Sequence, residues 1–247
     1  MKLTINNALS TLAITVSIVA IASAQTQPPL PSGDDVVARM MEFDAQRQSQ
    51  MTGYTAFRHY SAVNKKRHAD MLVQVTCRAD GAKQFDVLSE AGSGSIRKHV
   101  FQKLLSEETD ASRRGTRSGT RITPANYDFQ IIGQENLETG SAYVLQVSPK
   151  TENKYLIRGK IWVDASDYSI VRIEGQPARN PSFWVRSVHF VHTYQRVGQF
   201  WFASSTHTTS EIRIFGQSEL TIENSGYALL PLKDRSAEFE DQARSLQ

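Results

Sequence analysis

The sequence predicts a mainly β protein of the α+β class, in which an antiparallel sheet of about ten strands curls around two amphipathic helices. Apolar residues alternate with a period of two through most of the chain after Gly53, which is the period of a strand. Turn-rich breaks such as ENLETG and RVGQ separate many of these runs by short distances, which favours hairpins. Two other segments repeat with helical spacing, and their apolar stripes need a surface to cover.

The N-terminus predicts export. Lys2 precedes an apolar run from about Ala8 to Ala22, and Ala22-Ser23-Ala24 is a small-x-small cleavage pattern. The run is shorter than the ~20 residues that a membrane-spanning helix needs, so a retained anchor is the less favoured alternative. We expect a signal peptide over residues 1–24, cleavage near Ala24, and a soluble periplasmic product without a stable membrane anchor.

The remaining chain is expected to form one domain. Cleavage leaves about 220 of the 247 residues, a length that a single all-β domain often has. Residues 25–33 form a proline-rich leader, 34–228 the domain and 229–247 a charged tail. The single cysteine, Cys77, excludes an internal disulfide and is interpreted as a core residue. The net charge of +3 is mild, and together with export it argues against a nucleic-acid partner.

Two helices are predicted from their apolar stripes. From Asp34 the chain carries an apolar stripe with helical spacing, and residues 93–112 carry a second one. The members of the two stripes are Val36, Val37, Met40, Met41 and Phe43, and Ile96, Val100, Phe101, Leu104 and Leu105. The predicted order is therefore helix, about three strands, helix, about seven strands. The basic run after the second helix (Arg113, Arg114, Arg117 and Arg121) is interpreted as a solvated loop, with docking to an acidic partner or anionic headgroups as the alternative.

The segment FWVRSVHFVHTYQRVGQFWF, residues 183–202, holds a large share of the aromatic residues. Aromatic side chains in a hairpin are ordinarily core. The alternative is that they line a pocket, since a small curved sheet cannot bury so many large groups without helices or a ligand against them. Both interpretations remain open from the sequence.

The charged residues of the hairpin KIWVDASDYSIVRIE are interpreted as structural. Asp164 and Asp167 are turn residues, and Arg172 and Glu174 share a strand face, where they form an ion pair. Nothing nearby supplies a nucleophile, so a hydrolase that uses Asp164 and Asp167 is a minor alternative. His189 and His192 lie on a strand, where residues three apart point to opposite faces. No zinc-like cluster or G-x-S-x-G elbow is present, so we expect no metal, no cofactor and no enzyme activity.

Taken together, these features resemble the outer-membrane lipoprotein-sorting family, the LolA-like periplasmic lipoprotein carriers. The resemblance rests on the export signal, the amphipathic helix, the strand pair YTAFRHYSA and ADMLVQVTC, the inserted helical segment and the hairpin KIWVDASDYSIVRIE. That hairpin is similar to the family's apolar strand ending in Trp-Val-Asp, its turn, and its strand ending in Arg-Ile-Glu. The resemblance spans roughly residues 34 to 228, although this chain is longer than the compact carriers.

The resemblance implies a strongly curved antiparallel sheet, an incomplete β-barrel with amphipathic helices as its lid, around an apolar cavity for acyl chains. The implied function is a non-enzymatic carrier or binder of lipid or lipid-modified protein, with an inner- or outer-membrane protein as a further partner. A lipid-sensing regulatory module of the envelope is the alternative. Arg58 is the candidate lid or headgroup contact. The candidate ligand-contacting residues are Met71, Val73, Val75, Phe101, Leu104, Leu105, Phe129, Ile131, Tyr143, Leu145, Trp162, Trp184 and Phe190.

Overall fold

The computed structural model describes residues 30–112, 118–213 and 216–231. Helical elements are α1 (Gly33–Gln50), α2 (Gly94–Ile96), the π-helical turn η1 (Arg97–Phe101), α3 (Gln102–Ser112) and the short 3-10 turn η2 (Ser118–Thr120). The first strands are β1 (Gly53–Asn64), β2 (His68–Arg78), β3 (Lys83–Gly92), β4 (Tyr127–Leu137) and β5 (Gly140–Pro149). The remaining strands are β6 (Ile157–Asp164), β7 (Ile170–Pro177), β8 (Val185–Val197), β9 (Phe200–Ile212) and β10 (Gly216–Leu229).

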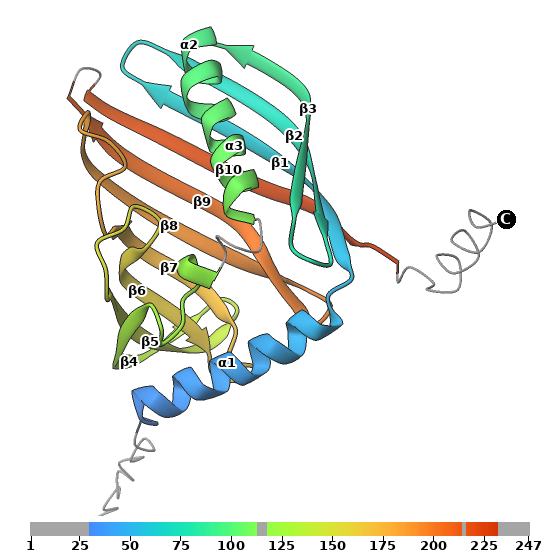
Figure 1. Cartoon of the computed structure of the whole chain (residues 1–247), viewed down its shortest axis with the longest axis vertical. Helices are drawn as coiled ribbons and strands as arrows, with labels where there is room; N and C mark the ends of the chain where they lie inside the picture. The colour runs from blue at the N-terminus through green and yellow to red at the C-terminus, as the bar shows by residue number, and fades with distance from the viewer. Residues whose placement is uncertain (1–29, 113–117, 214–215, 232–247) are drawn as a thin grey trace, which may run out of the picture.

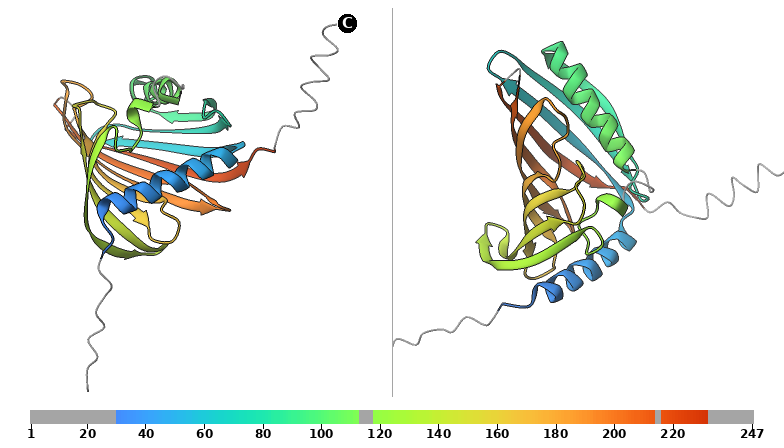
Figure 2. Two further views of the ribbon diagram at one scale, coloured as in Figure 1. Left: turned by 60° about the horizontal axis from the view of Figure 1, so that its bottom comes forward. Right: turned by 60° about the vertical axis from the view of Figure 1, so that its left-hand side comes forward.

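Within the described residues all ten strands form one antiparallel sheet in the order β3-β2-β1-β10-β9-β8-β7-β6-β5-β4. Consecutive strands are neighbours in the sheet except for β3 and β4, which lie at its two edges. Strand β1 pairs with β10, which joins the two ends of the domain in mid-sheet. Strands β3 and β4 are the free edges, so the sheet curves without closing (Figures 1 and 2). The predicted fold class and the predicted order of helices and strands are therefore confirmed.

One source of the curvature is a pair of glycines on neighbouring strands. Gly159 of β6 lies directly opposite Gly175 of β7. A Cβ added at Gly159 would lie 2.0 Å from the carbonyl oxygen of Glu174, so the two backbones approach too closely for any side chain. Glycine at such positions lets a sheet bend sharply.

The sheet has an inner and an outer face, which the strand registers define. On the inner face the paired residues run across the sheet as Tyr60, Ile222, Thr206, His192, Ile173, Ile161, Leu145 and Ile131. The pair Arg58–Asn224 lies on the same face, two residues along β1 and β10. The row is apolar toward β4 and polar at Thr206 and His192, on β9 and β8. The site described below lies where the row changes from apolar to polar residues.

Helix α1 covers the apolar side of the inner face. Its N-cap is Ser32, whose hydroxyl oxygen accepts a hydrogen bond from the amide of Asp35 at 3.0 Å, which satisfies one of the free amides of the first turn. Val36, Val37 and Met40 are buried in the first core cluster. Their partners on the sheet are Tyr127, Leu145, Val147, Leu156, Ile161, Val163 and Ile173.

The segment α2–η1–α3 covers the other side of the inner face, over β1 and β2 (Figure 1). Ile96 and Phe101 are buried there against Tyr60, and Leu104 and Leu105 pack at the margin of this second core cluster. The helix predicted for residues 93–112 is confirmed, and four of its five stripe residues face the core, whereas Val100 is exposed. Among the described residues, no helix has the length and apolar character needed to cross a membrane.

Several predictions concern residues that lie outside the part of the chain that the structure describes. The signal peptide, most of the leader and most of the charged tail lie outside the described residues, as do Arg113, Arg114 and Arg117. The boundaries of the domain at 34 and 228 therefore remain predictions. Arg121 is described, and it differs from a solvated loop residue because its guanidinium is half-buried in an ion pair with Asp44 of α1.

Candidate functional site

A cavity of about 650 Å³ lies between α1, the end of α3 and the inner face of the sheet. It occupies the region that neither core cluster fills. Its walls are the C-terminal half of α1, the last turn of α3 and the β2–β3 turn, and its floor comes from β8 and β9. Representative lining residues are Met40, Met41, Met51, Glu108, Ala111, Tyr168, His192, Tyr194, Phe200 and Phe202.

An aromatic cluster with rings from three strands lies at the cavity, and two of its members, Tyr54 and Phe202, line it. Phe202 stacks on Tyr227 with ring centroids 4.6 Å apart, and Tyr54 meets the edge of Phe202 at 4.8 Å. The Tyr227 hydroxyl donates to the carbonyl oxygen of Ala203 at 2.7 Å. Burial raises the pKa of Tyr54, Tyr194 and Tyr227. These phenols therefore stay neutral, and this part of the cavity wall is uncharged.

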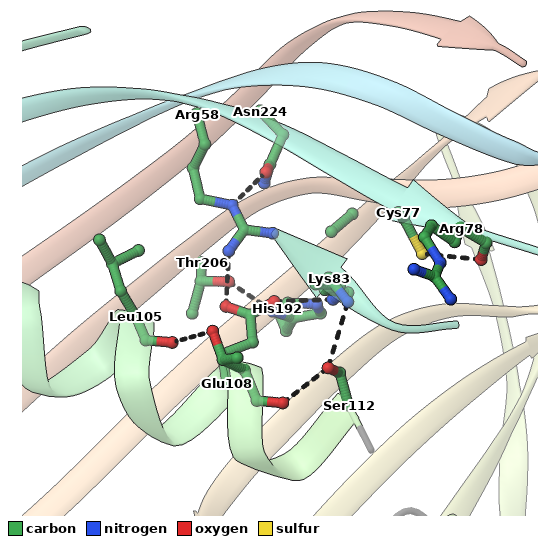
Figure 3. Close-up of polar contacts among 12 residues, drawn as sticks. Arg58, Cys77, Arg78, Lys83, Leu105, Glu108, Ser112, His192, Thr206 and Asn224 are labelled. Carbon is green, nitrogen blue, oxygen red and sulfur yellow. Dashed lines mark hydrogen bonds and ion pairs between the residues drawn. The ribbon is translucent and has the colours of Figure 1, made fainter. Parts of the chain in front are cut away.

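A charged bridge joins α3 to the sheet at the side of the cavity (Figure 3). Glu108 accepts from Arg58 of β1 at 2.6 Å and from Lys83 of β3 at 2.7 Å. Arg58 also donates to the Asn224 side-chain oxygen at 2.7 Å and to the Tyr60 hydroxyl at 3.1 Å. We call Glu108, Arg58 and Lys83 the Glu108 bridge.

Electrostatics keep the Glu108 bridge ionised. Burial alone would raise the pKa of the Glu108 carboxyl, but the cations of Lys83 and Arg58 outweigh it and lower the pKa to about 2. Burial likewise opposes the charge of Arg58, and Glu108 reverses the effect and raises the pKa of the guanidinium. The bridge is therefore charged at every physiological pH.

His192 contributes a neutral polar group to the floor. Burial, assisted by the positive charges of Arg58 and Lys83, lowers the pKa of the imidazole to about 4. Its Nδ1 contacts the Thr206 hydroxyl on the neighbouring strand (Figure 3). The cavity thus pairs an aromatic, apolar wall with a polar strip of the inner face.

The second half of α1 is attached to the sheet by polar contacts. Arg47 donates to the backbone carbonyl of Asp167 at 2.9 Å, and Asp44 pairs with Arg121. Tyr168, in the β6–β7 turn, stacks on Phe43 with ring centroids 5.6 Å apart. Tyr168 has a left-handed backbone with φ 55°, which is uncommon outside glycine, and its ring contacts help to hold that conformation.

Six of the predicted ligand contacts lie in the second core cluster. Met71, Val73, Val75 and Phe101 are at most 1% exposed there, and Leu104 and Leu105 are partly buried against them. The face of β2 that carries Met71 turns inward. These side chains fill the space under α3 with one another, and none of them is among the residues that line the cavity.

Five more lie in the first core cluster, beneath α1. Leu145 is fully buried, and Phe129, Ile131, Tyr143 and Phe190 pack around it. They too are absent from the cavity lining. The role of these eleven residues as ligand contacts stays a prediction, and the structure gives each of them a position in packed core.

Two predicted contacts, Trp162 and Trp184, lie away from the cavity and from both core clusters of the inner face, and their role as ligand contacts stays a prediction. Trp162 lies on the outer face of the sheet, opposite Val144 and beneath Arg172, because neighbouring residues of a strand point to opposite sides. Its indole donates to Glu135 at 2.7 Å. Trp184 lies in the β7–β8 loop and is 54% exposed.

Arg58 does contact the helix over the sheet, through Glu108. Sequence reasoning left every residue that lines the cavity out of the ligand contacts, among them Met40, Met41, Tyr54, Cys77 and Ile122. A partial signal was present for three others: Tyr194, Phe200 and Phe202 belong to the aromatic segment for which a pocket was the alternative interpretation, and they line the cavity. Cys77 is buried, as predicted.

The aspartates of the hairpin KIWVDASDYSIVRIE are turn residues, as predicted. The Asp164 carboxylate accepts from the amides of Ser166 at 2.8 Å and Asp167 at 3.1 Å. The Asp167 carboxylate accepts from the Ser169 amide at 2.9 Å and from the Trp201 indole at 2.8 Å. These hydrogen bonds outweigh burial and lower the pKa of Asp167. Both groups are thus committed to the turn.

Two further predictions about this region are confirmed. Arg172 pairs with Glu174 at 2.8 Å on one strand face. His189 and His192 both lie on β8, where one contacts Glu174 at the surface and the other contacts Thr206 on the inner face. Among the described residues no group of His, Cys, Asp or Glu is arranged to hold a metal ion.

The fold and the cavity together define a class of protein: an open, curved antiparallel sheet with helices over its inner face and a cavity beneath them. The sequence matches no protein-family model and no curated protein. The chain is similar to a solved DUF1329 family protein from Desulfovibrio piger, with 13% identity, 81% of this chain and 94% of that chain covered, and a TM-score of 0.42.

Two other similar structures carry the name of the family that the sequence resembles. One is a LolA superfamily protein from Nitrosomonas europaea, with 9% identity, 83% and 97% of the two chains covered and a TM-score of 0.38. The other is an outer membrane lipoprotein-sorting protein domain from Vibrio parahaemolyticus, with 11% identity, 79% and 94% covered and a TM-score of 0.40. At this level of similarity the function has to be argued from the cavity itself.

Proposed function

We propose that the protein is an exported, non-enzymatic periplasmic carrier that binds an acyl-bearing lipid or lipid-modified protein in the cavity between α1, α3 and the sheet. The observation that carries the proposal is a cavity of about 650 Å³ that the chain's own side chains leave unfilled. Its volume is within the ~300–1,000 Å³ typical of ligand pockets. Methionines of α1 and the rings of Phe200 and Phe202 offer an apolar wall.

The energetics of burial favour an acyl chain as the ligand. Each buried CH₂ contributes ~0.8 kcal/mol, so a sixteen-carbon chain supplies roughly 12 kcal/mol before the costs of association. No catalytic group is needed for this. The polar strip with His192 and the Glu108 bridge suits the other end of an amphiphile, because it offers hydrogen-bonding groups at the side of the apolar wall.

The Glu108 bridge offers a means of opening the cavity. It attaches the last turns of α3 by ionic contacts, whereas Ile96 and Phe101 in the first half of the segment are anchored in packed core. An incoming acyl chain can displace the bridged end while the anchored end stays in place. This distribution of contacts also supports the alternative of a lipid-responsive regulatory module, in which the displaced α3 is recognised by a membrane protein.

The test of the carrier function is uptake of an acyl probe. Protein purified from the periplasm would be analysed for bound lipid by mass spectrometry, delipidated, and titrated with a fluorescent fatty acid. We expect Ala111→Trp, which fills the cavity from α3, to reduce probe binding at least tenfold. Ala91→Trp, on the exposed part of β3, is the matched control and should bind as the unaltered protein does.

Two outcomes would contradict the proposal. One is the absence of both co-purified amphiphile and probe uptake. The other is equal uptake by the Ala111→Trp and Ala91→Trp variants, which would place the probe elsewhere. Capture of a stable membrane-protein partner whose affinity changes with bound lipid would favour the regulatory alternative.

A further inference from the structure

A basic and aromatic surface lies at the end of the sheet opposite the cavity. The cavity is bounded by the start of β1 and by the β2–β3 turn, whereas this surface is built on the β1–β2 turn, the β7–β8 loop and the end of β9. The twelve residues of β1 separate the two ends, which is roughly 35–40 Å at the rise of a strand. The surface therefore does not belong to the cavity.

The registers bring three separate segments together at this end. Asn64 at the end of β1 pairs with Ser218, Gly216 pairs with Ile212, and Ile212 pairs with Val185 at the start of β8. Strands β1, β10, β9 and β8 are consecutive, so the β1–β2 turn and the β7–β8 loop are about 15 Å apart. Figures 1 and 2 show these tips side by side.

Five cations of this end make no ion pair within the described part of the chain, and we call them the basic edge: Lys65, Lys66, Arg67, Arg179 and Arg213. All five are exposed. Most of the other charges nearby neutralise one another, since Arg186 pairs with Glu211, Arg158 with Glu152 and Lys154 with Glu107. Glu219 adds one exposed negative charge. The edge thus carries a clear excess of positive charge.

Two large aromatic side chains project beside the basic edge. Phe183 is 74% exposed and Trp184 is 54% exposed, and their rings meet edge to face with centroids 5.6 Å apart. We call this pair the aromatic tip. The guanidinium of Arg213 lies 4.7 Å from the centroid of Phe183, which places a cation directly against the apolar group.

The three tryptophans differ in how their indole N–H groups are used. Trp162 donates to Glu135 and Trp201 donates to Asp167. The indole N–H of Trp184 has no hydrogen-bond partner among the described residues. An exposed indole with a free donor is typical of side chains that lie at the headgroup level of a bilayer, where the ring is in apolar surroundings and the N–H is hydrated.

Both segments are held in shape before any partner binds. The Asn64 side chain accepts from the amides of Lys66 and Arg67 at 3.0 Å. In the loop, the Arg213 amide donates to the carbonyl oxygen of Trp184 at 2.9 Å, and the Arg213 side chain donates to that of Phe183 at 2.9 Å. Preorganisation of this kind lowers the entropic cost of binding.

We infer that this end of the sheet docks on an anionic phospholipid bilayer, with the aromatic tip at the headgroup level and the basic edge against the lipid phosphates. Charge complementarity favours this occupant, because each Lys or Arg near an anionic leaflet contributes about 1 kcal/mol. An acidic protein surface would also attract the cations. It would leave unexplained a protruding Phe–Trp pair with a free indole donor. Docking in this orientation leaves the cavity on the side away from the membrane.

The test is co-flotation with lipid vesicles. The protein would be purified from the periplasm, with its N-terminus determined by mass spectrometry so that every variant carries the same one. Vesicles of phosphatidylcholine alone are compared with an equimolar mixture of phosphatidylcholine and phosphatidylglycerol. We expect binding to the anionic vesicles only, weakened by added salt, with a blue shift of tryptophan fluorescence that Trp184→Phe abolishes.

Matched arginines separate a local effect from net charge. Arg179 lies on the basic edge, and Arg196, which is likewise exposed, lies at the other end of β8. Each is replaced by Glu. We expect Arg179→Glu to weaken vesicle binding at least fivefold and Arg196→Glu to leave it nearly unchanged. Trp184→Ala should weaken binding at least fivefold, whereas Leu88→Ala, at an exposed position of β3, should not.

The inference fails if the protein does not float with anionic vesicles, if Arg179→Glu and Arg196→Glu weaken binding equally, or if only an acidic protein is bound. These outcomes are independent of acyl-probe uptake, because the surface and the cavity share no residue. A protein that takes up the probe but does not bind vesicles would overturn this inference alone.

Discussion

The two ends of the α2–η1–α3 segment are attached to the same sheet by opposite means. At the first end Phe101 is fully buried and lies in a core cluster with Tyr60 and the inward residues of β2. At the other end Glu108 reaches Arg58 and Lys83 through charge-assisted hydrogen bonds beside the cavity. Packed apolar contacts hold a helix in one position, whereas ionic contacts at a partly hydrated site can be exchanged for other polar partners. The fold therefore fixes one end of the helix and leaves the other able to respond.

The largest effect is expected at the packed end. Phe101→Ala removes a fully buried ring and should lower the free energy of unfolding by about 3–5 kcal/mol, because truncating a buried aromatic leaves a cavity. Urea unfolding measures it. Val100→Ala, one residue away and 36% exposed, is the control and should cost less than about 1 kcal/mol. Equal losses of stability in the two variants would contradict the view that Phe101 anchors this end of the helix by packing.

A smaller effect is expected at the ionic end. Glu108→Gln leaves the buried Arg58 without its counter-charge, and removing one partner of a buried pair costs about 3–5 kcal/mol. Because the Glu108 side chain is 30% exposed, we expect about 2 kcal/mol by urea unfolding. Hydrogen exchange should quicken in α3 after residue 104 and stay slow at Phe101.

The control for Glu108→Gln is the exposed pair Arg186–Glu211. Glu211→Gln should change stability by less than about 1 kcal/mol, the usual value for surface pairs. If Glu108→Gln is as mild as Glu211→Gln, the Glu108 bridge does not restrain the helix.

The polar strip between the two core clusters of the inner face should make the stability of the protein depend on pH. The imidazole of His192 has its pKa lowered from 6.5 to about 4 by burial and by nearby cations. Below pH 6.5 the unfolded chain binds a proton that the folded chain excludes, so stability is full above pH 6.5 and falls until about pH 4. A pKa change of this size corresponds to about 3 kcal/mol. Because the imidazole is only partly buried, we expect a loss of roughly 2 kcal/mol across this window.

His192→Gln identifies the group responsible, because it keeps a hydrogen-bonding side chain next to Thr206 and cannot titrate. Its stability should be level between pH 6.5 and about 4.5. The depressed pKa of Glu108, about 2 against 4.5, removes stability only at still lower pH, as its carboxylate becomes protonated. A variant that keeps the original slope above pH 4.5 would exclude His192 as its source.

The smallest effect is expected on α1, whose second half is attached by single polar contacts. Arg47→Ala removes the hydrogen bond to the Asp167 carbonyl and should cost about 1 kcal/mol. Thermal unfolding compares it with Gln46→Ala, an exposed neighbour on the same helix, which should be nearly neutral. If Arg47→Ala costs more than Glu108→Gln, the polar contact of α1 restrains its helix more strongly than the Glu108 bridge restrains α3.

More of the fold than of the site could be predicted from the sequence, because the sequence signals for helices, strands and turns are local. A period of two between Met71 and Cys77 and a helical stripe from Ile96 to Leu105 depend only on neighbouring residues. The turn at Asp164 was equally local, since its carboxylate bonds amides two and three residues away. The cavity lining is not set by local residues, because it depends on contacts such as that of Arg58 with Glu108, which are 50 residues apart in the sequence.

The predicted ligand contacts and the residues that line the cavity differ for a physical reason. The predicted contacts were chosen as large apolar side chains on one strand or helix face, and such residues bury one another most completely, as Met71 and Phe101 do. The unfilled space lies instead beside His192, where the inner face carries polar groups. Size and hydrophobicity cannot reveal this, because the register of β8 and β9 decides it.

By itself, the sequence determined the order of helices and strands, the antiparallel hairpins, the turn at Asp164 and the apolar stripes of both helices, since each follows from residues close together in the chain. Only the tertiary structure decided that β1 pairs with β10, that the two core clusters stand apart, and that Trp162 faces outward while Trp184 stands exposed beside Arg213. Those outcomes depend on how distant strands are registered and how far apart two helices settle on a curved sheet, and no local pattern encodes either.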